Sequence, residues 1–199
     1  MRLVILDRDG VINEDSDDFI KSPEEWIPIP GSLEAITRLC REDYRVVLAT
    51  NQSGVARGLF DMDTLNQIHL RMLDQIRQKG GEIDAIFFCP HGPDDGCDCR
   101  KPKAGMFRDI ADRLHINITG VPVVGDSLRD IQAAQVVDAL PILVLTGKGK
   151  KTLDNMGKDE IKGMAVFEDL YAFSEALIAG QLDGRISDVI TLSDSYPVD

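Results

Sequence analysis

The stretch "LVILDRDGVIN" (residues 3–13) joins a short apolar run to two acidic residues, Asp7 and Asp9. Four consecutive apolar side chains predict a strand that is covered on both faces, as in a parallel sheet, because a strand with one wet face would alternate. Ligands of such sheets bind beyond the carboxyl ends of the strands. The stretch therefore predicts both a parallel-sheet fold and a ligand site at the carboxyl end of this strand.

The same pattern recurs along the chain. Further strands are expected at 46–49, 84–88, 121–124, 142–145 and 165–167, and amphipathic helices at 32–42, 64–79, 104–114, 128–138 and 168–179. Strands that alternate with helices over short connections predict an α/β fold, with a doubly wound, mostly parallel sheet and helices on both of its faces.

We expect a single domain over residues 1–180 and an acidic, mobile tail over residues 181–199. The Lys- and Gly-rich residues 146–163 predict a mobile loop with at most one helical turn. Roughly 40 residues separate Asp9 from Thr50, and a loop, a helix and a strand use most of them, so no folded cap domain fits there. The ligand site should therefore be open, with its specificity set by loops.

Charge limits the class of partner. The chain has 199 residues and a formal net charge of −12, which argues against nucleic acid and against anionic membrane surfaces. A small anionic substrate is compatible with this charge, because a few basic groups in one cleft can outweigh the global field. With neither a signal-peptide pattern nor an apolar run of transmembrane length, we expect a cytoplasmic monomer that acts on a small molecule.

Polar residues follow four of the expected strands. They are Asp7-Arg8-Asp9-Gly10, Thr50-Asn51-Gln52-Ser53-Gly54, a cysteine-rich loop that ends in Arg100-Lys101, and Gly125-Asp126-Ser127. Helix capping explains any one of these groups but not all four at one edge. Asp7 and Asp9 should project to the same side of an extended chain, and Asp126 adds a third carboxylate. Such an oxygen-rich site suits Mg²⁺, which also binds substrate phosphate.

A carboxylate beside Mg²⁺ that faces a phosphate can act as a nucleophile and form an aspartyl-phosphate. The transferred phosphoryl group then needs donors for its oxygens, and Thr50, nearby backbone N–H groups and Lys101 are available. Asp130, one turn after Asp126, could orient a water on the metal or favour the helix N-terminus electrostatically, and we favour the first role.

The segment "CPHGPDDGCDCRKP" (residues 89–102) gathers four potential metal ligands, Cys89, His91, Cys97 and Cys99. Three thiolates and one imidazole complete a tetrahedral Zn²⁺ shell without an open position, so a zinc ion here would be structural. Clamping this loop would also order Arg100 and Lys101, which are entropically costly to immobilise. A cluster of unligated thiols and a C-x-C redox pair are the alternatives.

Four motifs occur in order over residues 3–138: "LDRDGVIN", "ATNQSGVARG", "CDCRKPKAGMF" and "VGDSLRDIQAA". Together they resemble the signature motifs of the haloacid dehalogenase (HAD) superfamily of phosphatases. The resemblance implies that Asp7 is the nucleophile and that Asp9 is first the general acid and then the general base. It places Thr50 and Lys101 on the phosphoryl oxygens, and Mg²⁺ on Asp7, the main-chain carbonyl of Asp9 and Asp126. It also implies Zn²⁺ in the cysteine loop.

Within the superfamily, the motifs resemble phosphatases that remove the 7-phosphate of a heptose 1,7-bisphosphate. This implies sugar contacts from Asp15, Asp18, Asn51, Gln52, Ser53, Arg57 and Arg100. Histidinol-phosphate phosphatases are an alternative with a similar metal loop, and "TNQSGVARG", which supplies Arg57, favours the heptose enzymes. Receiver domains of signalling proteins also place Asp, Thr and Lys around Mg²⁺, but they lack an acid-base carboxylate such as Asp9.

Overall fold

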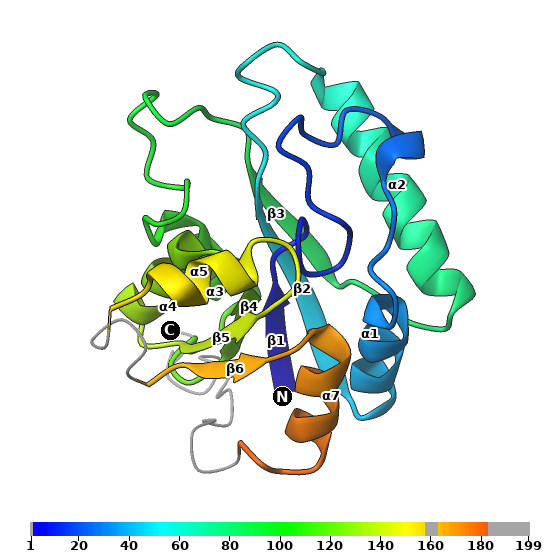
Figure 1. The fold of residues 1–199 in the computed structure, drawn as a ribbon, viewed down its shortest axis with the longest axis vertical. Helices are drawn as coiled ribbons and strands as arrows, with labels where there is room; N and C mark the ends of the chain where they lie inside the picture. Colours follow the sequence, from blue (N-terminus) through cyan, green and yellow to red (C-terminus); the bar gives the residue numbers. More distant parts are fainter. Residues whose placement is uncertain (1, 158–162, 183–199) are drawn as a thin grey trace, which may run out of the picture.

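The computed structural model describes residues 2–157 and 163–182, so most of the expected acidic tail lies outside the described residues. The described strands form one parallel sheet in the order β3-β2-β1-β4-β5-β6 (Figure 1). They are β1 (Arg2–Leu6), β2 (Tyr44–Asn51), β3 (Ala85–Cys89), β4 (Pro122–Gly125), β5 (Leu140–Val144) and β6 (Ala165–Phe167). The predicted fold class is confirmed.

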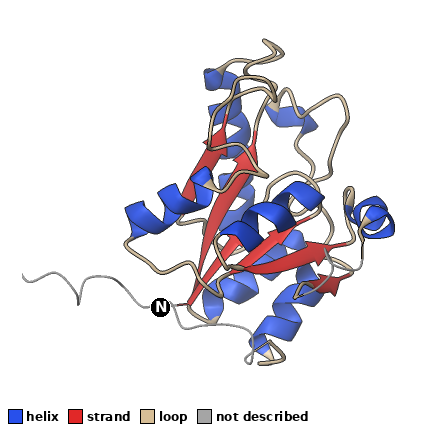
Figure 2. Cartoon of the chain, turned by 90° about the vertical axis from the view of Figure 1, so that its left-hand side faces the viewer, coloured by secondary structure: helices blue, strands red, loops and turns tan. Residues whose placement is uncertain are grey.

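Helices cover both faces of this sheet, as Figures 1 and 2 show. They are α1 (Ser32–Arg41), α2 (Met62–Gln78), α3 (Gly105–Leu114), α4 (Leu128–Val136), α5 (Gly149–Asn155) and α7 (Leu170–Ile178), with a short 3-10 turn at Pro23–Glu25. In Figure 1, α1, α2 and α7 lie to one side of β1, and α3, α4 and α5 lie to the other.

The packing of β1 between two helical layers explains its unbroken run of apolar residues. Val4 and Leu6 belong to the apolar cluster that includes residues of α1 and α7. Leu3 and Ile5 belong to a second cluster, which includes residues of α3 and α4. Because successive side chains of a strand point to opposite faces, a strand between two helical layers needs an apolar residue at every position.

The strand order reverses next to β1, since β2 and β3 lie on one side of it and β4 to β6 on the other. Leu6 pairs with Val124, and the backbone N–H of Asp7 donates to the carbonyl of Val124 over 2.9 Å. The carboxyl ends of β1 and β4 are therefore neighbours, at the position where doubly wound sheets bind ligands.

The prediction for residues 146–163 was wrong in part. Helix α5 has 7 residues, about two turns at 3.6 residues per turn, where at most one turn was expected. Leu153 packs against an apolar cluster that contains Ile131 and Leu143, and tertiary packing of this kind stabilises short helices that composition alone disfavours. Residues 158–162 of this segment lie outside the described residues.

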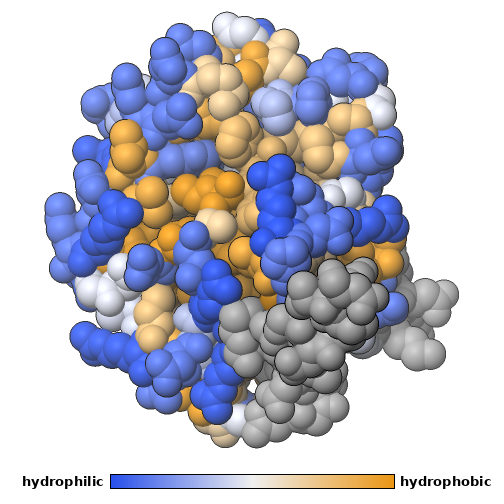
Figure 3. Space-filling model, turned by 180° about the vertical axis from the view of Figure 1, so that it is seen from behind, coloured by the Kyte–Doolittle hydropathy of each residue, from blue (hydrophilic) through white to orange (hydrophobic). Residues whose placement is uncertain are grey.

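Figure 3 shows the face behind that of Figure 1, where apolar side chains gather toward the middle and hydrophilic ones surround them. Among the described helices, none combines the length and the apolar character needed to cross a bilayer.

Candidate active site and metal loop

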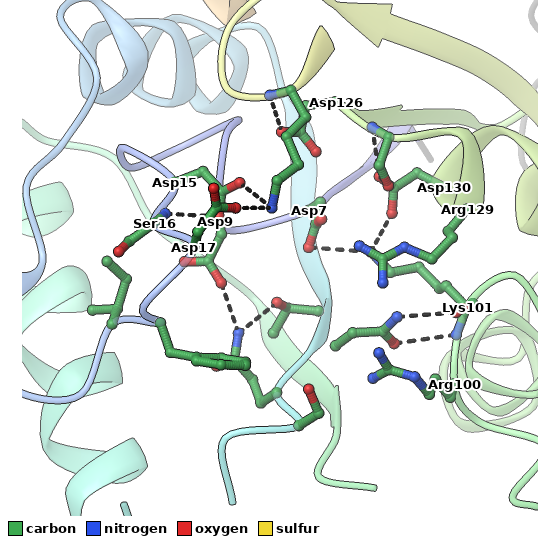
Figure 4. A pocket seen from close by; sticks show the side chains of 18 of the residues that line it. Asp7, Asp9, Asp15, Ser16, Asp17, Arg100, Lys101, Asp126, Arg129 and Asp130 are labelled. Atoms are coloured by element: carbon green, nitrogen blue, oxygen red, sulfur yellow. Dashed lines mark hydrogen bonds and ion pairs between the residues drawn. The ribbon is translucent and has the colours of Figure 1, made fainter. Parts of the chain in front are cut away.

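A pocket of about 280 Å³ lies at the carboxyl ends of β1, β2 and β4. Its lining includes most of the site residues that the sequence predicted, namely Asp7, Asp9, Asp15, Thr50, Asn51, Gln52, Ser53, Arg57, Arg100, Lys101 and Asp126. Asp18 lies outside that lining, whereas its neighbour Asp17 belongs to it. Figure 4 shows Asp15 and Asp17 on one side of the pocket, Arg100, Lys101 and Arg129 on the other, and Asp126 between the two groups.

Lys101 lies at the centre of the charged groups. Its Nζ is 3.1 Å from Asp7 Oδ1 and 2.6 Å from Asp130 Oδ1, and it donates to the Ala49 carbonyl over 2.8 Å. The side chain is only 2% exposed. Burial opposes the charged ammonium, but Asp130 and Asp7 outweigh this effect and raise the pKa of Lys101. Lys101 is therefore a buried cation held beside the expected nucleophile.

When both are ionised, Asp7 and Asp126 carry more negative charge than Lys101 alone can balance. Burial raises the pKa of Asp126 to about 8, and Asp130 and Asp7 add to this effect. Burial likewise raises the pKa of Asp7 to about 6, against the lowering effect of Lys101. Carboxylate oxygens of Asp7, Asp126 and Asp130 all lie within 4.8 Å of one another. A divalent cation would relieve this crowding, so the site fits Mg²⁺.

Asp130 is already engaged by protein groups. Besides its ion pair with Lys101, its Oδ2 accepts hydrogen bonds from the backbone N–H and the hydroxyl of Ser127. The bond from the Ser127 backbone N–H is part of a capping box at the start of α4. The carboxylates left for a metal are therefore those of Asp7 and Asp126. Asp130 supports the helix N-terminus and Lys101, and its expected effect on a metal-bound water stays a prediction.

Asp9 is held by four hydrogen bonds. Arg8 donates from Nε and Nη2, both over 3.0 Å, Asn13 donates over 2.9 Å and Gln52 over 3.0 Å. Burial by itself would raise the pKa of Asp9, but Arg8, Asn13 and Gln52 together lower it below its ordinary value. Asp9 is therefore ionised in this state, which suits a proton acceptor.

Strand β2 joins the pocket to the metal loop. Asn51, the last residue of β2, donates from Nδ2 to the Lys101 carbonyl over 3.0 Å and accepts from the Lys101 N–H over 3.1 Å. The buried hydroxyl of Thr50 accepts a hydrogen bond from Gln52 over 2.9 Å. The backbone of Lys101 is thus fixed to β2, while its side chain reaches Asp7.

The four expected zinc ligands converge on one point. Cys89 Sγ lies 3.6 Å from His91 Nδ1, 3.6 Å from Cys97 Sγ and 3.2 Å from Cys99 Sγ, and His91 Nδ1 lies 3.3 Å from Cys99 Sγ. Tetrahedral ligands bound at about 2.3 Å from Zn²⁺ would be about 3.8 Å apart. The spacing is close to that of a zinc shell, and the donor set suits this metal.

Several side chains at the pocket were missed at the level of sequence. Arg8 and Asn13 stand inside the first motif, but nothing in the sequence assigned them to Asp9. Arg129 and Lys148 also line the pocket. Lys148 follows β5, so the strand-end rule that found the other residues could have found it.

Comparisons with known proteins point to one family. A family model described as HAD-hydrolase-like matches residues 98–173. The D-glycero-beta-D-manno-heptose-1,7-bisphosphate 7-phosphatase of Bordetella bronchiseptica is 61% identical over 178 residues, which cover 89% of this chain and 98% of that protein. The enzyme of the same name from Pseudomonas aeruginosa is 53% identical over 176 residues, which cover 88% and 97%.

A solved structure of the heptose bisphosphate phosphatase from B. bronchiseptica, complexed with magnesium and phosphate, has a TM-score of 0.87 and 60% sequence identity. The match covers 90% of this chain and 99% of that one.

Proposed function

The chain belongs to the D-glycero-D-manno-heptose-1,7-bisphosphate 7-phosphatases of the HAD-like hydrolases, and from this premise we propose how its residues hydrolyse the 7-phosphate of D-glycero-β-D-manno-heptose 1,7-bisphosphate. As a member of this family it is a phosphoric monoester hydrolase. The observation that carries the mechanism is the meeting of Asp7 and Asp126 with the buried ammonium of Lys101.

Asp7 would attack the phosphorus and become an aspartyl-phosphate, while the sugar oxygen leaves. Lys101 and Thr50 would hold the phosphoryl oxygens as charge develops on them. Asp7, Asp126 and the main-chain carbonyl of Asp9 would hold Mg²⁺. When bound, the ion neutralises charge on the carboxylates and on the phosphoryl oxygens.

Asp9 has to serve in two protonation states. It gives a proton to the leaving sugar oxygen in the first step and takes one from the attacking water in the second. In the free enzyme Arg8 holds this carboxylate ionised, which suits the second step. The first step therefore requires Asp9 to leave Arg8 and bind a proton when the substrate enters.

The second phosphate of the substrate would meet a group of arginines. Arg57, Arg100 and Arg129 line the same pocket, and within the described part of the chain none of the three forms an ion pair with a carboxylate. Burial lowers the pKa of Arg100, and the positive charges of Arg129 and Arg57 lower it further. Closely spaced guanidinium groups in a chain of net charge −12 favour a bound phosphate.

A substrate comparison tests this function. Phosphate release by the magnesium-loaded enzyme would be measured with the β and α anomers of the heptose bisphosphate and with histidinol phosphate. We expect the largest kcat/KM for the β anomer. A larger kcat/KM for histidinol phosphate would reverse the assignment to the heptose substrate.

We expect magnesium affinity to fall with falling pH. The pKa of Asp126 is raised to about 8, so below that pH the metal-free enzyme holds a proton there that Mg²⁺ must displace. The magnesium affinity should therefore drop about tenfold per pH unit between pH 8 and pH 6. Calorimetry in buffers with different ionisation enthalpies would measure both the affinity and the proton release. Asp126→Asn should lose both, and an affinity that stays constant between pH 8 and pH 6 would contradict the assignment of Asp126.

Zinc removal should impair activity through the loop. Purified protein should contain about one Zn²⁺ per chain, and Cys97→Ser should lose it. The variant should unfold at a lower temperature and turn over more slowly, because Arg100 and Lys101 follow the last ligand. Cys40→Ser, at the cysteine outside the cluster, is the matched control and should retain zinc and activity. A Cys97→Ser enzyme with normal zinc content would rule out this site.

A further inference from the structure

Lys148, in the connection between β5 and α5, touches two separate parts of the pocket. Its backbone N–H donates to Asp126 Oδ2 over 2.7 Å. Its Nζ lies 2.7 Å from Asp15 Oδ2 and 3.4 Å from Asp17 Oδ1. One residue therefore connects a carboxylate expected to bind the metal with a loop expected to contact the sugar.

The backbone around Lys148 has little freedom. The Thr146 hydroxyl donates to the Gly10 carbonyl over 2.6 Å. A Cβ on Gly147 would lie 2.2 Å from Asp126 Oδ2 and 2.5 Å from Gly10 Cα, so only glycine allows this approach. The origin of the Lys148 side chain is thus fixed relative to Asp126 and Gly10.

Besides its ion pairs with Lys148, the loop of residues 15–19 is attached to neighbouring residues at its far end, near Phe19. Asp15, Asp17 and Phe19 line the pocket. At that far end the Arg57 guanidinium lies 5.7 Å from the centre of the Phe19 ring, and Lys21 Nζ donates to the carbonyls of Asp18 and Phe19 over 2.8 and 3.4 Å. Asp17 and Asp18 are exposed, so burial of apolar side chains does little to order this part of the loop. Without Lys148, the carboxylates of the loop would also repel the carboxylates around Asp126.

We propose that Lys148 is a positioning residue that holds the 15–19 loop beside the metal end of the pocket and thereby determines selectivity for the sugar. The inference rests on the proposed function. Every substrate presents a phosphoryl group to Asp7, but only one with a large polar leaving group reaches the 15–19 loop. Loss of Lys148 should therefore weaken selection of the leaving group while sparing the transfer to Asp7.

The test compares two substrates. Lys148→Met should lower kcat/KM for the heptose bisphosphate about ten- to a hundredfold, mainly through KM, as misplaced binding groups do. For p-nitrophenyl phosphate, whose aromatic leaving group has neither sugar hydroxyls nor a second phosphate, kcat/KM should change less than about twofold on the same argument. Lys148→Arg should restore most of the selectivity. Lys150→Met, at an exposed lysine of α5, is the matched control and should behave as wild type.

A double-mutant cycle tests whether Lys148 acts through Asp15. Asp15→Asn should reproduce part of the defect, and Lys148→Met combined with Asp15→Asn should be no worse than the poorer single variant. Additive losses would overturn the proposal, as would an equal loss on both substrates. The effect of Lys148→Met would also be measured with a heptose 7-phosphate, which lacks the second phosphate. If it escapes the defect, Lys148 binds the second phosphate directly and the positioning role is wrong.

Amide hydrogen exchange separates this inference from the proposed function. In the enzyme without substrate, Lys148→Met should speed exchange in residues 14–20 and leave β1 and β4 unchanged. Unchanged exchange in residues 14–20 would overturn the proposal whatever the substrate is. Faster exchange in an enzyme that prefers histidinol phosphate would support the loop contact and refute only the heptose assignment.

Discussion

Asp7→Asn is expected to reduce phosphate release by about 10⁴-fold or more, because the amide is not a nucleophile and the covalent route is lost. The fold should survive the change. The pKa of Asp7 is raised to about 6, with burial as the largest cause, so above that pH the charged carboxylate destabilises the native state. Removing the charge should leave the free energy of unfolding at pH 8 equal or higher.

Steady-state phosphate release and urea denaturation would measure the two effects. Asp112→Asn, at an exposed position on α3, is the control and should change neither. An Asp7→Asn enzyme with near-normal turnover would contradict the mechanism, whereas an inactive and unfolded variant would contradict the account of how the carboxylate is buried.

Lys101→Met should cost both activity and stability. Removing a buried donor to the developing charge typically lowers kcat by about 10²–10³-fold. The change also leaves Asp130, whose side chain is 2% exposed, without its cation, and breaking a buried pair in this way costs about 3–5 kcal/mol. Lys101 lowers the pKa of Asp130 against the opposing effect of burial. Without Lys101 that pKa should rise, so the stability loss should shrink as the pH falls.

A second variant separates the two roles of Lys101. Lys101→Met combined with Asp130→Asn removes both charges, so it should recover much of the stability but none of the activity. Denaturant unfolding at pH 5 and pH 8 and steady-state kinetics would measure this. Lys151→Met, at an exposed lysine of α5, serves as the control. Recovery of activity in the double variant would show that Lys101 acts only by holding the structure together.

The strand-end residues were predictable because the fold leaves few choices. Once apolar runs fix a parallel sheet, the carboxyl ends of its strands share one edge, so Asp7, Thr50 and Asp126 must approach one another there. Lys101 lies further from the end of its strand, and the Asn51 side chain fixes its backbone beside them. The four zinc ligands were also predictable, because they lie so close together in the sequence that they must share one site.

Side-chain direction within loops was not predictable. Phe19 has a φ of 65°, so the chain turns just after Asp17 and Asp18, and no periodicity tells which of the two faces the pocket. Lys148 was missed because its segment was expected to be a mobile loop. A cytoplasmic location, a monomeric state and the absence of nucleic-acid partners stay predictions from composition and sequence pattern.

The central claim is that Asp7 becomes phosphorylated, and trapping the intermediate tests it most directly. Asp9→Asn should slow hydrolysis of the aspartyl-phosphate, while p-nitrophenyl phosphate needs little acid assistance to form it. After mixing with Mg²⁺ and an acid quench, mass spectrometry of the peptides should find one added phosphoryl group on the peptide that contains Asp7. An unmodified Asp7 peptide, recovered after a burst of p-nitrophenol equal to the enzyme concentration, would contradict the account.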